Sequence, residues 1–72
     1  MRTEYFDVEG MPISLGYMRG ASSYCMAWDT DPPRPFDPGS AHRNGARISA
    51  FEFLRLVVQV AHAETLRKAG QG

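Results

Sequence analysis

Residues 49–68 read SAFEFLRLVVQVAHAETLRK, and this stretch decides the fold because it predicts one long helix. Ser49 and Glu52 have the spacing of a capping box, in which the serine hydroxyl accepts from the glutamate amide and the carboxylate accepts from the serine amide. Good helix formers follow the cap, and Gly70 comes just after them, where a glycine commonly ends a helix. The sequence therefore predicts a C-terminal helix over residues 50–68.

The predicted helix carries apolar side chains around most of its circumference, at about 100° per residue. One stripe, wide enough to cover a small sheet, comprises Ala50, Phe51, Leu54, Val57, Val58 and Ala61. A second ridge, on the side away from the centre of that stripe, comprises Phe53, Leu56 and Val60. A surface helix needs an apolar arc of only about 100°. We therefore expect the first stripe to cover the sheet and the second ridge to be free for a partner, unless the long proline loop folds over it.

Three stretches near the N-terminus have the patterns of strands. Residues 4–8 are rich in aromatic and β-branched side chains, and residues 12–18 and 22–28 alternate between larger and smaller side chains. Short connections that contain glycine, at 9–11 and 19–21, have the length that closes hairpins. The sequence predicts a three-stranded antiparallel β-meander with the first and third strands at its edges.

A long segment without hydrophobic periodicity lies between the strands and the helix. Residues 29–47 contain four prolines, and each proline removes a backbone donor and disfavours helix at the residue before it. The segment is therefore predicted to be a long proline-rich loop, with Phe36 packed onto the domain. Together these elements predict a single α+β domain over residues 1–72, in which one C-terminal helix packs on the sheet.

Length and composition restrict the setting. A chain of 72 residues buries only roughly 60% of the surface that its unfolded form exposes, so association is expected to add stability. The net charge is zero, which disfavours partners held by summed positive charge, such as nucleic acid and anionic lipid. The net charge is zero because two opposite charges cancel. Residues 1–37 hold six acids and three bases, and residues 38–72 hold five bases and two acids. No apolar run is long enough to span a membrane, and a cytoplasmic protein is expected.

Candidate chemistry is sparse along the chain. Cys25 lies on the small-residue side of a predicted strand and is expected to be a buried apolar residue, not a nucleophile. Asp29, Asp31 and Asp37 lack the ligand spacing and glycine of a calcium loop. The sequence therefore predicts no catalytic residue, no metal, no cofactor and no enzyme activity. A weaker alternative, an enzyme subunit whose chemistry lies mostly in another chain, would use Asp29 or His62.

These observations favour a non-enzymatic protein-interaction module, that is, a small inhibitor, regulator or accessory subunit. It is expected to dock through the C-terminal helix on a larger protein or on itself as a homodimer. The expected partner-binding residues are Phe53, Leu56, Val60, Arg55 and Gln59. The alternative is a single-stranded nucleic-acid binder, which would stack bases on an aromatic sheet face flanked by arginines. The residues of that face would be Tyr17, Arg19, Tyr24, Trp28 and Arg34.

Overall fold

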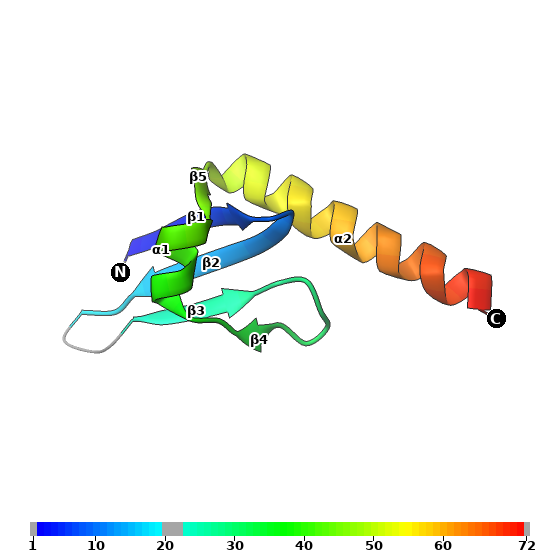
Figure 1. Cartoon of the computed structure of the whole chain (residues 1–72), viewed down its shortest axis with the longest axis horizontal. Helices are drawn as coiled ribbons and strands as arrows, with labels where there is room; N and C mark the ends of the chain where they lie inside the picture. The colour runs from blue at the N-terminus through cyan, green and yellow to red at the C-terminus, as the bar shows by residue number, and fades with distance from the viewer. Residues whose placement is uncertain (1, 20–22, 72) are drawn as a thin grey trace.

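The computed structural model of the chain describes residues 2–19 and 23–71 and has an α+β fold (Figure 1). Within these residues, five strands form one antiparallel sheet in the order β4-β3-β2-β1-β5. The α+β class with an antiparallel sheet and a C-terminal helix is confirmed, whereas the predicted three-stranded meander is wrong. In chain order the elements are β1 (Arg2–Val8), β2 (Met11–Tyr17), β3 (Tyr24–Ala27), β4 (Arg34–Pro35), α1 (Pro38–Asn44), β5 (Ala46–Ile48) and α2 (Ala50–Gln71).

The β1–β2 hairpin forms where its pattern predicted it. Glu9 and Gly10 connect the strands and both have positive φ, 54° and 85°, as a two-residue type I′ turn requires. The Asp7 carboxylate accepts a hydrogen bond from the Gly10 amide at 2.7 Å and so holds the turn closed. The second predicted hairpin also has paired strands, because β2 pairs antiparallel with β3. Most of the predicted 19–21 connection and the predicted start of the third strand lie outside the described residues.

The segment predicted as one loop, residues 29–47, contains β4, α1 and β5. Helix α1 forms because the Asp37 carboxylate accepts hydrogen bonds from the amides of Gly39 and Ser40, at 3.3 and 3.2 Å. Pro38 occupies the first turn of the helix, where a missing N–H has no helical partner to lose. The short strands β4 and β5 pair with β3 and β1 and so occupy the two edges that were predicted for the first and third strands.

One face of the sheet, which we call the α1 face, carries the main core. Strand alternation places Phe6, Ile13 and Leu15 on this face, and the two aliphatic side chains are completely buried. Ala41 of α1 is also completely buried in this cluster. Phe36 packs against the cluster, as predicted, and its amide donates to the Cys25 carbonyl.

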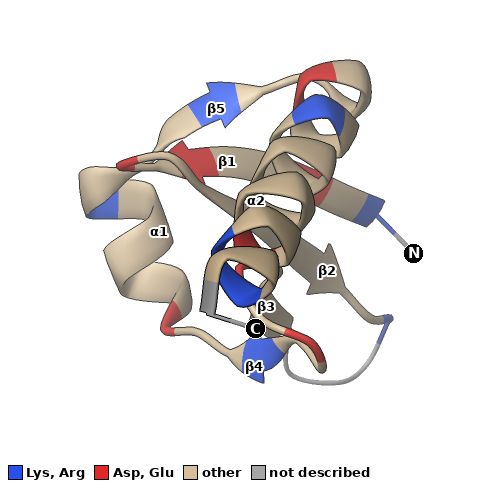
Figure 2. Cartoon of the chain, turned by 90° about the vertical axis from the view of Figure 1, so that its right-hand side faces the viewer, with Lys and Arg blue, Asp and Glu red and all other residues tan. Residues whose placement is uncertain are grey.

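The opposite face of the sheet, the α2 face, is covered by the first half of α2. Figure 2 looks along the long axis and shows α1 to the left of the strands and α2 passing in front of them. The predicted start of α2 is confirmed, because Ser49 Oγ accepts from the Glu52 amide at 3.1 Å. The Glu52 carboxylate pairs with Arg55 instead of completing the capping box. The helix also continues past Gly70 to Gln71, three residues beyond the predicted end.

Helix α2 is longer than the sheet that supports it. Its 22 residues span about 33 Å at 1.5 Å per residue, and Figure 1 shows its C-terminal half extending beyond the strands. The molecule measures 47 × 20 × 20 Å with a radius of gyration of 13.2 Å, whereas a compact chain of this length has about 11 Å. Residues 65–70 are all exposed, so this part of the helix has little support from the rest of the chain.

Candidate functional site

The inner face of α2, defined here as Phe53, Leu56, Val57 and Val60, points toward the sheet. Phe53 is buried, and its ring centroid lies 4.6 Å from that of Tyr5 and 6.2 Å from that of Trp28. The Trp28 ring is perpendicular to the Phe53 ring. A hydrogen bond from its indole N–H to Ser14 Oγ of β2, at 2.8 Å, holds the ring in place. This aromatic cluster sets which side of α2 contacts the sheet.

The predicted assignment of the two apolar sides of α2 is therefore wrong for most of its residues, although Val57 faces the sheet as expected. Phe53, Leu56 and Val60, expected to be free for a partner, are buried or partly buried. Phe51 and Leu54, expected to cover the sheet, are 69% and 60% exposed. The positions are exchanged because apolar residues surround most of the helix, so its own periodicity does not select a side. The contacts of Phe53 with Tyr5 of β1 and with Trp28, which follows β3, select it.

The outer face of α2, defined here as Phe51, Leu54, Arg55, Val58 and Gln59, lines a shallow hollow on the surface. Positions 51, 54 and 58 fall on one side of a helix, and Val58 is 65% exposed. Arg55 and Gln59, two of the predicted partner-binding residues, belong to this outer face. Figure 2 shows turns in the middle of α2 without Lys, Arg, Asp or Glu, between charged residues near each end, which matches residues 56–63, where none of these four residue types occurs.

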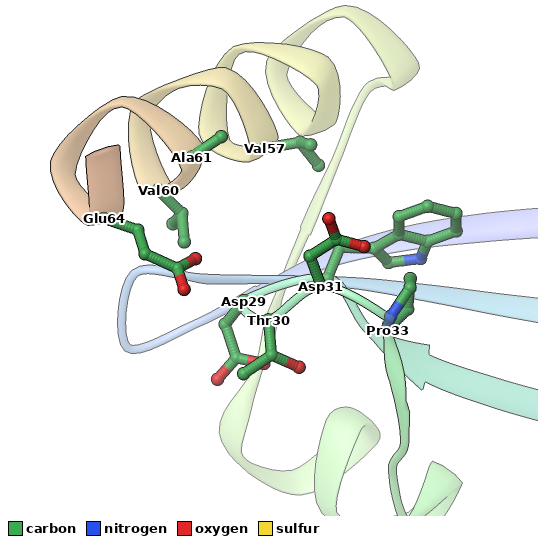
Figure 3. Close-up of a pocket in the computed structure, with 9 residues that line it drawn as sticks. Asp29, Thr30, Asp31, Pro33, Val57, Val60, Ala61 and Glu64 are labelled. Atoms are coloured by element: carbon green, nitrogen blue, oxygen red, sulfur yellow. The ribbon is translucent and has the colours of Figure 1, made fainter. Parts of the chain in front are cut away.

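A cleft of about 230 Å³ lies between α2 and the β3–β4 connection. Figure 3 shows Val57, Val60 and Ala61 on the helix side, and on the other side it shows Asp29, Thr30, Asp31 and Pro33. The Trp28 side chain also lines the cleft. Its lining is therefore mostly apolar, and its position continues the inner face of α2 toward the projecting end of the helix.

Three carboxylates stand around this cleft, those of Asp29, Asp31 and Glu64. Asp29 Oδ2 accepts from Arg34 at 3.0 Å, whereas Asp29 Oδ1 is buried without a hydrogen-bond partner. The cleft can thus accept a hydrogen-bond donor or a positive group. Among the described residues no group of three or more histidine, cysteine or acidic side chains is arranged to hold a metal ion.

The aromatic face predicted for nucleic acid is not assembled as one surface. The pairing of β2 with β3 places Gly16 opposite Tyr24, so Tyr24 lies on the α2 face, while Tyr17 lies on the α1 face. Trp28 is on the α2 face, where Phe53 and Ser14 hold its ring. The five predicted residues are therefore divided between the two sides of the sheet.

The arginines of that predicted face are also separated from each other. Arg34 pairs with Asp29 beside the cleft. Arg19 lies at the other end of the sheet, in an open hollow with Arg2 and Tyr17, where the Arg2 guanidinium stands 4.7 Å from the Tyr17 ring centroid. Tyr17 and Arg19 are thus the two members of the predicted face that share a hollow in the described part of the chain.

The cysteine and the two histidines do not line the hollow of the outer face or the cleft. Cys25 is 5% exposed, and its burial, together with the nearby Asp37 carboxylate, raises the pKa of the thiol above its ordinary value. The predicted burial of Cys25 is confirmed. His42 packs its ring against Phe6 and lies near the Tyr17 hydroxyl on the α1 face, and His62 is exposed on α2.

Comparisons with protein-family models, curated proteins and solved structures give no match. Over the described part of the chain, no helix combines the length and the apolar character that crossing a membrane requires. Of the surfaces described above, the outer face of α2 has the most exposed large apolar side chains.

Proposed function

We propose that this chain is a non-enzymatic protein-interaction module that binds a protein partner through the outer face of α2. One observation carries the proposal: Phe51, Leu54 and Val58 occupy successive turns of one helix face and are 69%, 60% and 65% exposed. Single exposed apolar residues are common on protein surfaces, but a contiguous group of them marks an interaction site. A helix that lays such a face into an apolar surface is a recurrent recognition mode.

The exposed apolar side chains of this face supply part of the free energy that association needs. Full burial of a phenylalanine, leucine or valine side chain contributes about 1.5–3 kcal/mol, so the exposed fractions of the three side chains offer roughly 4 kcal/mol together. Association costs of several kcal/mol oppose this term. Contacts from Arg55 and Gln59 at the border of the face must therefore add to the apolar term. Inhibitors, regulators and accessory subunits all act through such contacts.

A cytoplasmic location forms part of the same proposal. The one cysteine is unpaired and buried, which suits a reducing compartment.

Site-specific photo-crosslinking tests the proposal. A photoreactive phenylalanine analogue replaces Leu54 in the full chain, and in a matched control it replaces Arg43, which is exposed on α1. We expect an adduct of defined mass from position 54 that disappears when Val58→Asp is added, and none from position 43. Equal adducts from both positions, or none from position 54, would contradict binding through the outer face.

A second proposal, single-stranded nucleic-acid binding, has support only from the open hollow of Arg2, Tyr17 and Arg19. An arginine stacked on an aromatic ring is a feature of such sites. Fluorescence anisotropy of a labelled oligonucleotide, titrated at rising salt, tests it. Binding that weakens steeply with salt and is lost with Arg19→Ala would support this proposal, and absence of binding would remove it.

A further inference from the structure

We propose that the partner on the outer face of α2 is a second copy of this chain, packed with its α2 antiparallel to the first and with a two-fold axis passing beside Leu54 and Arg55. This inference rests on the proposed interaction through the outer face and specifies its partner. Three properties of the face support it: the placement of its apolar residues, the placement of its charges, and its orientation relative to the sheet.

The apolar residues of the outer face lie at nearly equal spacings on the two sides of Leu54. Phe51 lies three residues before Leu54 and Val58 lies four residues after it. In an antiparallel helix pair centred beside Leu54, a residue before the centre in one copy lies opposite a residue after the centre in the other. Phe51 of each copy then meets Val58 of the other, and the two Leu54 side chains meet at the axis. The large side chain is thus matched with a smaller one at both ends.

The charges beside this seam are complementary to themselves. Glu52 and Arg55 form an exposed pair at 3.3 Å, and both project on the same flank of the apolar positions. Antiparallel helices bring the same flank of each copy together, as in coiled coils. Glu52 of one copy therefore lies near Arg55 of the other, and each intramolecular pair can be exchanged for an intermolecular one. A two-fold interface requires this kind of self-complementarity.

A parallel arrangement lacks this complementarity. Parallel helices bring opposite flanks together, and the flank opposite Glu52 and Arg55 carries Ala50 near the same height, which has no charge. The antiparallel arrangement is thus the one that gives both charged groups a partner. Since the whole chain has zero net charge, no long-range repulsion opposes the approach of two copies.

The orientation of the outer face leaves room for a second copy. The inner face of α2 is buried on the sheet through Phe53, so the outer face points away from every strand. Two copies joined through it place their sheets on the outside of a central helix pair. One helix crossing buries less than the 1,200–2,000 Å² of a standard stable interface. We therefore expect a reversible dimer with a dissociation constant in roughly the micromolar range.

Sedimentation equilibrium over a range of concentrations tests the inference. The wild-type mass should rise from the 8.0 kDa of one chain toward twice that value. Glu52→Arg and Arg55→Glu should each weaken the dimer roughly tenfold or more, because each places like charges opposite one another at two symmetric positions. An equimolar mixture of these two variants should regain dimer, since the facing charges are then opposite. Arg67→Glu, an equal charge change at an exposed position far from the centre, should leave the affinity unchanged.

Several results would overturn the inference. The inference is wrong if the wild-type chain stays monomeric at every concentration or if the charge variants dimerise as strongly as the wild type. It is also wrong if the equimolar mixture of the two variants does not regain dimer. Far-UV circular dichroism of each variant confirms that it is folded. If the mass stays at one chain while crosslinking from position 54 gives an adduct heavier than two chains, the second copy is wrong and the proposed interaction stands. If neither dimer nor adduct is found, both are wrong.

Discussion

Two phenylalanines of α2, two positions apart, test how the helix sits on the sheet. Phe53 is 7% exposed and Phe51 is 69% exposed. Replacement of a buried phenylalanine by alanine costs about 3–5 kcal/mol, and Phe53→Ala also removes ring contacts with Tyr5 and Trp28. Phe51→Ala removes few intramolecular contacts and improves helix propensity, so its effect should stay within about 0.5 kcal/mol.

The scale of the first loss is large for this chain. A domain of 72 residues has a total unfolding free energy of roughly 4–11 kcal/mol, at about 0.05–0.15 kcal/mol per residue. Phe53→Ala should therefore remove from about a third to nearly all of it, and with a urea dependence of about 1 kcal/mol per molar its midpoint should fall by about 3–5 M. Urea titration followed by far-UV circular dichroism measures both variants. The protein concentration is kept low, because association would add its own stabilisation.

If Phe51→Ala costs as much as Phe53→Ala, or more, then the outer face is covered within the chain. The exchange of the two helix faces would then be wrong, and the outer face would lose its role in binding. Trp28 fluorescence gives an independent reading, because Phe53→Ala removes one of its ring neighbours and Phe51→Ala does not.

Three further predictions concern other parts of the fold. Ser49→Ala should cost about 1 kcal/mol in a urea titration, since it removes the acceptor of the Glu52 amide; an unchanged midpoint would mean that the cap contributes nothing. Glu9→Asn should raise the thermal midpoint, because Glu9 has φ of 54° and asparagine adopts this region at lower cost. Finally, the raised pKa of Cys25 means that above about pH 8.5 the unfolded chain loses its thiol proton before the folded one. The unfolding free energy should therefore fall as pH rises through this range. The contribution of the thiol to this fall should be absent in Cys25→Ala. If that variant has the same pH profile of unfolding free energy as the wild type, the prediction is wrong.

Local signals explain the elements that could be predicted from the sequence. The aromatic and β-branched composition of β1, the alternation in β2, the turn at Gly10 and the cap at Ser49 all act over a few residues. Each element formed where its pattern indicated. Helix α1 was missed although Asp37-Pro38 is a regular start of a helix. The prolines before Asp37 suggested a loop, and the helix is only seven residues long.

Contacts between distant segments explain what could not be predicted. Strands β4 and β5 have two and three residues, too few for a periodic pattern, and they exist because β3 and β1 offer edges for pairing. The side of α2 that faces the sheet was assigned wrongly for a similar reason. It depends on where Phe53 meets Tyr5 and Trp28, and no window of sequence contains all three rings. The predicted partner-binding residues depended on that assignment, because it placed Phe51, Leu54 and Val58 in the core.

The overhang of α2 gives one helix two different local stabilities. Amides of residues 53–60 can exchange with solvent only when the inner face leaves the sheet, which approaches global unfolding. Amides of residues 65–70 lie in a segment that is exposed on all sides, and short unsupported helices are marginal in water, so these amides should exchange by fraying from the C-terminus. Hydrogen exchange along α2 should therefore fall into a slow and a fast class, with the boundary near Glu64. A ligand that binds the C-terminal end of α2 would slow hydrogen exchange only for the amides of the fast class.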